Sequence, residues 1–155
     1  MSAKKTRKEV EILYYERVRP PLWLIAFIFF LLASLSLSIW AAFDNPAGQI
    51  SLALSLLAVG VMAVKVALKL EIDSAEFRAG AAHIELKYLG EVADLSADQM
   101  RLVRGRDADP AAFLAIRFWQ PKGIKIEICD PRDPTPYWLV SSKRAKQLRE
   151  ALQKN

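Results

Sequence analysis

The clearest pattern in the chain is an uncharged apolar stretch over residues 22–43. As a helix it would extend roughly 33 Å at 1.5 Å per residue, and the hydrocarbon core of a bilayer is about 30 Å thick. A second apolar stretch covers residues 50–68 and has Lys65 in its last turn, where the long side chain can reach the lipid head groups. The pattern therefore predicts two transmembrane helices, joined by a turn over residues 44–49.

After the second stretch, short runs alternate between apolar and polar residues and are separated by turn residues, which is typical of β-strands. The residues 113–119 and 124–129 are expected to pair as a hairpin around 120–123. The residues 96–99 have the form of a capping box and offer an alternative start for a helical turn. The expected strands are residues 68–72, 76–79, 83–88, 91–95, 100–104, 113–119, 124–129 and 137–140.

A helix is predicted at the end of the chain, over residues 143–153, with Ser141 or Ser142 as its N-cap. Its apolar side should face inward through Ala145, Leu148 and Leu152. The predicted fold class is thus an α+β membrane protein: a two-helix transmembrane hairpin followed by a small antiparallel β-rich domain with a C-terminal helix.

Three segments follow from these patterns. Residues 1–21 are expected to form a basic cytosolic arm and interfacial anchor, in which Tyr14 and Tyr15 lie at head-group level. Residues 22–68 form the transmembrane hairpin, and residues 69–155 the cytosolic β-rich domain. A secretory signal peptide also begins with basic residues and an apolar run, but its run spans only about 7 to 15 residues, so cleavage is not expected.

The net charge of +5 is concentrated before the first apolar stretch. Residues 1–21 carry six Lys and Arg against three Glu, whereas the region from residue 69 carries fifteen against thirteen acidic residues. Anionic lipid head groups are the nearest partner for such charge, and no nucleic-acid binding is expected. Because the turn over residues 44–49 lacks Lys and Arg, we expect a two-span protein of the cell membrane with both termini in the cytoplasm.

Candidates for catalysis are few. Cys129 is the only cysteine and His83 the only histidine, which excludes an internal disulfide and argues against a metal site built from these residue types. The sequence contains no glycine-rich phosphate loop, nucleophile elbow or metalloprotease helix. We therefore assign no catalytic residue, metal or cofactor from the sequence.

The most distinctive string follows the predicted strand at residues 124–129. Three prolines in residues 130–136 stiffen this loop, which reduces the entropy lost when its side chains are held in place. Arg132 offers a planar fork of donors suited to carboxylate or phosphate groups. The same rigidity would also serve to join two strands at a fixed angle, and both interpretations stay open. The candidate binding residues are Arg132, Asp130, Asp133, Tyr137 and Trp138.

Several strings together resemble a family of small two-span membrane proteins of unknown function from high-GC Gram-positive bacteria. The specific part of the resemblance is the string at residues 130–142. It is accompanied by Tyr-Tyr-Glu-Arg at residues 14–17, Ala79-Gly80, Arg104-Gly105 and Asp109-Pro110. The resemblance implies an integral membrane location and brings no known activity. More loosely, the order of elements is similar to bacterial pleckstrin-homology-like membrane proteins, which favours an interaction module over an enzyme.

Two classes of function remain. The first is a membrane-tethered cytosolic binding or regulatory module that contacts a protein partner or anionic lipid head groups. The alternative is a membrane-associated enzyme or a transport accessory subunit. Small residues on both apolar stretches, among them Ser55 and Gly60, allow close helix packing. That packing would serve the hairpin or a homo-oligomer, and one sequence does not separate the two.

Overall fold

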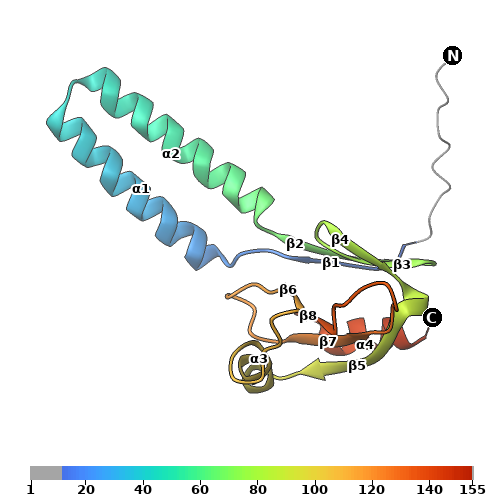
Figure 1. The fold of residues 1–155 in the computed structure, drawn as a ribbon. Helices are drawn as coiled ribbons and strands as arrows, with labels where there is room; N and C mark the ends of the chain where they lie inside the picture. Colours follow the sequence, from blue (N-terminus) through green and yellow to red (C-terminus); the bar gives the residue numbers. More distant parts are fainter. Residues whose placement is uncertain (1–11, 155) are drawn as a thin grey trace, which may run out of the picture. The chain divides into compact units, whose positions relative to one another are not determined.

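The computed structural model describes residues 12–154, which fall into two compact units. One unit consists of residues 19–67 and is a pair of helices, here termed the helical hairpin. The other combines residues 12–18 with residues 68–154 and is termed the β unit (Figure 1). The chain thus leaves the β unit once and returns to it.

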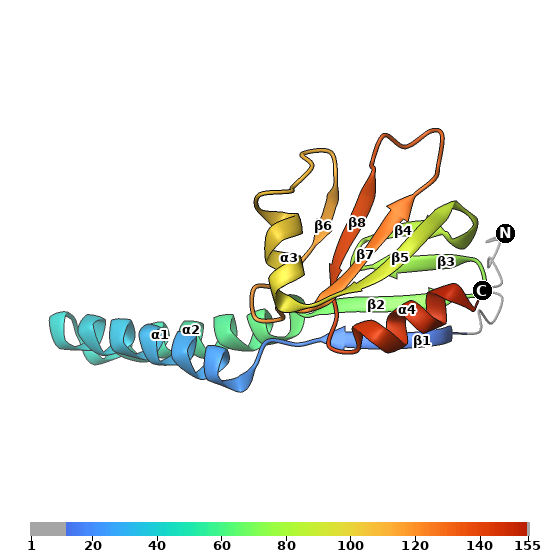
Figure 2. The same cartoon turned by 90° about the horizontal axis from the view of Figure 1, so that it is seen from below.

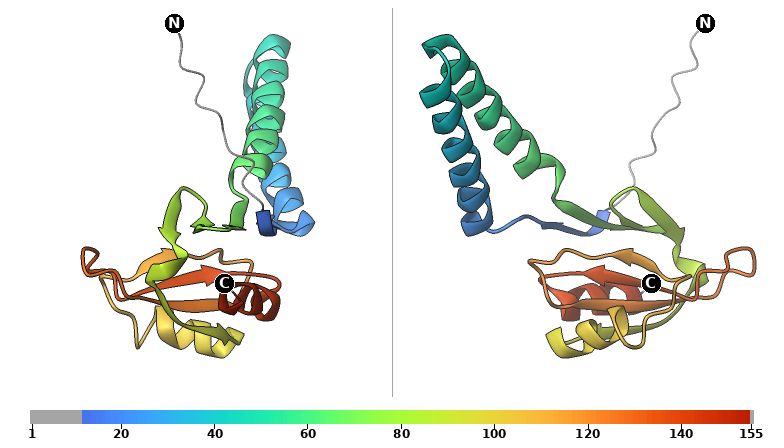
Figure 3. Two further views of the ribbon diagram at one scale, coloured as in Figure 1. Left: turned by 90° about the vertical axis from the view of Figure 1, so that its right-hand side faces the viewer. Right: turned by 60° about the vertical axis from the view of Figure 1, so that its left-hand side comes forward.

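The helical hairpin consists of α1, Leu22–Ala42, and α2, Asn45–Lys65 (Figure 3). Both helices are long and apolar enough to cross a membrane, and most of their side chains are exposed. The second helix begins at Asn45, five residues earlier than predicted. The residues expected to form the turn instead form its first turn, because the Asp44 carboxylate accepts a hydrogen bond from the Ala47 amide at 3.4 Å and Pro46 fits a first helical turn.

The two helices contact each other through small residues. The Ser36 and Ser55 hydroxyls are buried and lie 3.0 Å apart. A Cβ atom added at Gly48 would lie 2.5 Å from Cγ of Trp40, so only glycine fits there without movement. At Gly60 nothing lies within 4 Å of such an atom. Of the small residues predicted to pack, Ser55 is therefore at the contact and Gly60 is not.

The β unit contains two four-stranded sheets, which lie one above the other in Figure 1 and are seen from below in Figure 2. The first sheet is antiparallel. Its strands lie side by side in the order β1 (Ile12–Val18), β2 (Leu68–Asp73), β3 (Glu76–Ala79) and β4 (Ala82–Glu85). A 3-10 turn, Leu86–Tyr88, leads to the second sheet. Its order is β5, Leu89–Leu95, β7, Gly123–Ile128, β8, Tyr137–Ser141, and β6, Phe113–Ala115. Two helices complete the unit: α3, Ala97–Arg104, and α4, Ala145–Gln153.

The core of the β unit lies between the two sheets. Alternate residues of β2 and β3 meet alternate residues of β7 and β8, and the rings of Phe77 and Trp138 are 6.1 Å apart. Helix α4 packs on β5, β7 and β1, which brings it to the edge strand of each sheet. Leu148 and Leu152 on its inner side are buried, as predicted. The structure is thus α+β, with two long apolar helices, antiparallel-rich sheets and a C-terminal helix.

The N-terminal segment differs from the prediction. Residues 12–18, expected in a basic arm and interfacial anchor, form β1, which pairs antiparallel with β2 up to Val18 opposite Leu68. Buried Glu16 and Val18 alternate with more exposed neighbours, which is the period-two pattern of a strand. The strand with which they pair comes only after the helical hairpin in the sequence. Residues 1–11 of the predicted arm lie outside the described residues.

Two further predictions about strands were wrong. Residues 100–104 belong to α3, the alternative indicated by the capping box, in which the Gln99 amide donates to the Ser96 hydroxyl at 3.3 Å and the Ser96 amide donates to the Gln99 side chain at 2.8 Å. The expected hairpin of 113–119 with 124–129 does not form. The strand β6 ends at Ala115 and pairs in parallel with β8, which lies between it and β7.

The start of α4 also differs from the prediction, because neither predicted serine caps it. Its N-cap is Arg144. Ser141 donates its hydroxyl to the carbonyl of Gln120 at 3.1 Å, and Ser142 donates its hydroxyl to the Glu16 carboxylate at 2.5 Å. Both hydroxyls thus donate to neighbouring segments, and the Ser142 oxygen also accepts from the amide of the N-cap residue Arg144 at 3.1 Å.

Candidate functional site

The loop between β7 and β8 is held by its own aspartates. The Asp130 carboxylate accepts from the Arg132 amide at 2.9 Å, and the Asp133 carboxylate accepts from the Thr135 amide at 2.9 Å. The Asp133 amide donates to the Asp130 carbonyl at 3.1 Å. Together with the prolines, these bonds fix the backbone from which the Arg132 side chain projects.

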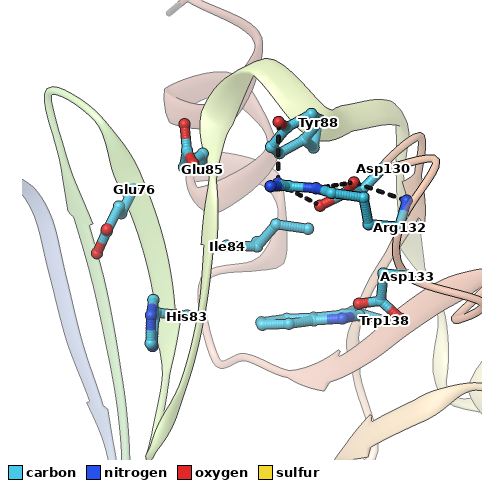
Figure 4. Close-up of a pocket in the computed structure, with 9 residues that line it drawn as sticks. All are labelled: Glu76, His83, Ile84, Glu85, Tyr88, Asp130, Arg132, Asp133 and Trp138. Carbon is cyan, nitrogen blue, oxygen red and sulfur yellow. Dashed lines mark hydrogen bonds and ion pairs between the residues drawn. The ribbon is translucent and has the colours of Figure 1, made fainter.

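Arg132 is bound by two partners (Figure 4). Its Nε and Nη2 atoms each donate to the Asp130 carboxylate at 3.1 Å, and Nη2 also donates to the Tyr88 hydroxyl at 3.0 Å. The guanidinium lies 5.3 Å from the centre of the Tyr88 ring, within cation–π range. These bonds lower the pKa of the Asp130 carboxyl and raise the pKa of Arg132. The side chain nevertheless stays 73% exposed, so one face of the guanidinium can meet a ligand.

Arg132 borders a small cavity of about 200 Å³. The loop residues and Trp138 lie on one side, with Tyr88 of the 3-10 turn next to Arg132, and Glu76 of β3 and His83 of β4 lie on the other side (Figure 4). Four carboxylates line it against a single guanidinium: Glu76, Glu85, Asp130 and Asp133. Three of these already have cationic partners, since Glu76 pairs with Arg78, Glu85 with Lys87 and Asp130 with Arg132. The cavity is thus a polar site in which acidic groups predominate.

The candidate residues divide into two groups. Asp130, Arg132, Asp133 and Trp138 line the cavity, although the Trp138 ring is largely buried in the core against Phe113. Tyr137 lies on the opposite face of β8, as strand alternation requires. Its hydroxyl accepts from the Asp109 amide at 3.1 Å, and its ring packs in a separate apolar cluster. The structure therefore brings four of the five residues together.

The predicted arrangement missed a buried carboxylate. Glu16 on β1 is only 4% exposed and accepts from the Lys143 amide at 2.7 Å, the Ser142 hydroxyl at 2.5 Å and the Tyr14 hydroxyl at 2.8 Å. Arg144 donates to the Tyr15 carbonyl at 2.8 Å. These bonds clamp β1 to the segment before α4. Burial of Tyr14, with a further contribution from the Glu16 carboxylate, raises the pKa of its phenol well above its usual value.

The residues of this clamp come from two short segments that are far apart in the sequence. These are Tyr-Tyr-Glu-Arg at residues 14–17, which is part of the family resemblance, and Ser-Ser-Lys-Arg at residues 141–144, and nothing local indicates that the two segments meet. A Glu in a strand next to buried positions is a usable signal, because it must find donors when it is buried.

A family model described as "Protein of unknown function (DUF3093)" matches residues 13–152. The chain belongs to this family. The DUF3093 match begins in β1 and ends in α4, so it includes both units and both strings of the Glu16 clamp. No curated protein and no solved structure matches the chain. The family match confirms the predicted membership of a family of unknown function. The high-GC Gram-positive origin stays a prediction.

The cavity of this DUF3093 chain is lined mainly by charged and polar side chains. Within residues 12–154, no group of three or more His, Cys, Asp or Glu side chains is arranged to hold a metal ion. Cys129 is exposed and follows directly after β7. Arg132 is held in position by Asp130 and Tyr88, and its side chain stays largely exposed.

Proposed function

We propose that this protein is a membrane-tethered binding module: the helical hairpin spans the cell membrane, and the β unit, a pleckstrin-homology-like domain on the cytoplasmic side, binds a protein partner. The observation that carries this proposal is the pairing of β1 with β2. One strand precedes the two apolar helices and the other follows them, yet they are neighbours in one sheet.

This pairing supports a two-span topology. If the helices cross a bilayer, the residues before α1 and after α2 must be on the same side for β1 and β2 to pair, so both helices cross or neither does. The large apolar side chains exposed along both helices favour crossing, because soluble proteins rarely leave so much contiguous apolar surface in water. They include Leu22, Phe30 and Leu37 on α1, and Leu54 and Leu57 on α2.

The cytoplasmic orientation rests on charge and on the cysteine. Lys and Arg flank the outer ends of the two helices but are absent from residues 44–49. The free thiol of Cys129 suits a reducing compartment. The two four-stranded sheets followed by a C-terminal helix support a pleckstrin-homology-like fold for the β unit.

The proposed contact with the partner is the cavity at Arg132. Its predominance of carboxylates disfavours anionic lipid head groups and favours a protein surface that carries its own cations. A backbone carbonyl of the partner would accept a hydrogen bond from the exposed face of Arg132, whose position is already fixed by Asp130 and Tyr88. A prearranged arginine loses little entropy on binding.

A matched pair of variants tests this function. Arg106, like Arg132, is highly exposed, at 75%, and is paired with a carboxylate close in sequence, Asp107. We expect a stoichiometric partner to co-purify with the full chain from gentle detergent, to be lost with Arg132→Ala, and to be retained with Arg106→Ala. The expected weakening is roughly tenfold or more, as for loss of a charge-assisted hydrogen bond.

Equal retention by both variants would contradict the role of Arg132. A purified chain that recovers only further copies of itself would point to a homo-oligomer. Turnover of a substrate by the chain alone would favour the alternative class, a membrane-associated enzyme.

A further inference from the structure

A second concave surface, of about 610 Å³, lies on the β unit away from the Arg132 loop. It is bordered by the residues before α3, the residues before β7 and the beginning of α4. One carboxylate lines it, Asp94, which is paired with Arg149. We term this surface the basic concavity, because four cations line it: Lys122, Lys143, Arg144 and Lys146.

The charge of the basic concavity is not balanced by acidic side chains. Within the described part of the chain, none of its four cations forms an ion pair. Like charges that converge on one hollow repel one another, and the repulsion is relieved when an anion enters.

The backbone adds to the positive potential. Helix α4 begins at Ala145 with no side-chain cap and no acidic residue in its first turn. The first amides of a helix have no partner within the helix, and the positive end of its dipole lies there. Lys146 in the first turn is at the end of the helix where a cation is disfavoured, so an anion bound there would gain from the amides and the lysine together.

The basic segment is also held in place. The Lys143 amide donates to the buried Glu16 carboxylate, and Arg144 donates to the Tyr15 carbonyl while its guanidinium lies 5.1 Å from the centre of the Tyr14 ring. The side chains of Lys143 and Arg144 therefore project from a backbone fixed on β1, and less entropy is lost when they close on a ligand.

We propose that the basic concavity binds a phosphate group, through Lys122, Lys143, Lys146 and the first amides of α4. The group could belong to a phospholipid head group or to free phosphate in solution. The site is distinct from the acidic cavity at Arg132. Only the lipid source rests on the proposed membrane location, because the three residues 19–21 that separate β1 from α1 would keep the β unit near the bilayer surface.

Hydrogen exchange of the amides at residues 145–147 provides a local test, with the full chain in nanodiscs of phosphatidylcholine alone. Inorganic phosphate is added against potassium chloride at equal ionic strength. The second arm replaces part of the phosphatidylcholine with phosphatidylglycerol. We expect these amides to exchange several-fold more slowly when the phosphate group is bound.

Variants separate the site from general charge effects. Lys143→Gln combined with Lys146→Gln should weaken the effect by roughly tenfold or more, since two charge-assisted contacts are lost. Lys154→Gln, at the opposite end of the same helix, should leave it unchanged. An effect of inorganic phosphate in phosphatidylcholine nanodiscs indicates a soluble source, and an effect only with phosphatidylglycerol indicates the lipid.

Two results would overturn the proposal. One is unchanged exchange at residues 145–147 with both probes. The other is an effect that persists undiminished in the double variant, or that potassium chloride reproduces. Neither result would bear on the Arg132 cavity, which is read out by partner co-purification.

Discussion

Replacing Glu16 by alanine should destabilise the β unit more than most single changes. The substitution leaves the Lys143 amide, the Ser142 hydroxyl and the Tyr14 hydroxyl without their acceptor. The two hydroxyls can turn toward other groups, but the amide is fixed by the backbone. A donor that loses a charged acceptor in a buried place costs about 1.5–3 kcal/mol. Because the contributions are not additive, we expect a total loss of about 3–5 kcal/mol.

The more conservative substitution Glu16→Gln provides a second measurement of the free energy of unfolding. Glu16→Gln keeps one carbonyl oxygen for the Lys143 amide, and its new NH₂ group can donate to an oxygen of Ser142 or Tyr14. The charge is lost but the Lys143 amide and one of the two hydroxyls keep a partner, so the expected loss is about 1–2 kcal/mol. Glu91→Ala, an exposed position on β5, serves as control and should change stability by less than about 0.5 kcal/mol.

The assay is urea unfolding of the full chain in a mild detergent, followed by tryptophan fluorescence. In all variants Trp23 and Trp40 are replaced by phenylalanine, so that the signal reports Trp119 and Trp138 of the β unit alone. A loss below about 1 kcal/mol for Glu16→Ala would refute the argument that this carboxylate clamps β1 to the segment before α4. Equal losses for alanine and glutamine would show that charge, not acceptor count, decides the energy.

Three further predictions concern pH and packing. The pKa of the Tyr14 phenol is raised in the folded state, so above about pH 10 the unfolded chain loses this proton while the folded chain keeps it, and the free energy of unfolding falls. Tyr14→Phe should remove part of this alkaline loss of stability, measured by urea titrations at about pH 9 and about pH 11. Gly48→Ala should lower the melting temperature of the helical hairpin in detergent, whereas Gly60→Ala should leave it unchanged or raise it slightly, and equal effects would contradict the Trp40 contact. Because Arg132 lowers the pKa of Asp130, their pair is fully present above the ordinary aspartate pKa of about 4 and is lost as pH falls through the lowered pKa. Carboxyl NMR shifts should show Asp130 titrating at a lower pH than an aspartate in an unstructured peptide.

The apolar helices could be predicted because their signal is local and repeated. Their length and lack of charge depend on no distant partner, and the structure contains both. The start of α2 was placed too late because Asn-Pro and Gly also favour turns, and only the capping bond of Asp44 distinguishes a turn from a first helical turn. Local chemistry alone therefore left a five-residue ambiguity.

The strands show where local reasoning ends. A strand is stabilised by its neighbour, and β1 meets β2 only after residues 19–67 have intervened. The same applies to β6, whose neighbour β8 comes later in the chain than β7. Short alternating runs indicate that strands exist, but the sheet order depends on packing across the core, which no single run encodes.

The candidate site was predicted in part. Proline content identified the loop, and Arg132 does project from it. Its hydrogen bond to Tyr88 joins residues 44 positions apart through the 3-10 turn between the sheets, which no local pattern reveals. The inclusion of Tyr137 with Trp138 ignored strand alternation, which places adjacent side chains on opposite faces.

The position of the helical hairpin between β1 and β2 also constrains how the protein can be made. The first strand is synthesised before either apolar helix, and its neighbour in the sheet is synthesised after both. If only one helix were inserted into the membrane, the two strands would end on opposite sides and the first sheet could not close. If both helices span a membrane as proposed, completion of the β unit would therefore depend on correct insertion of both, and a wrongly inserted chain would expose the unpaired edge of β2 to proteases and chaperones.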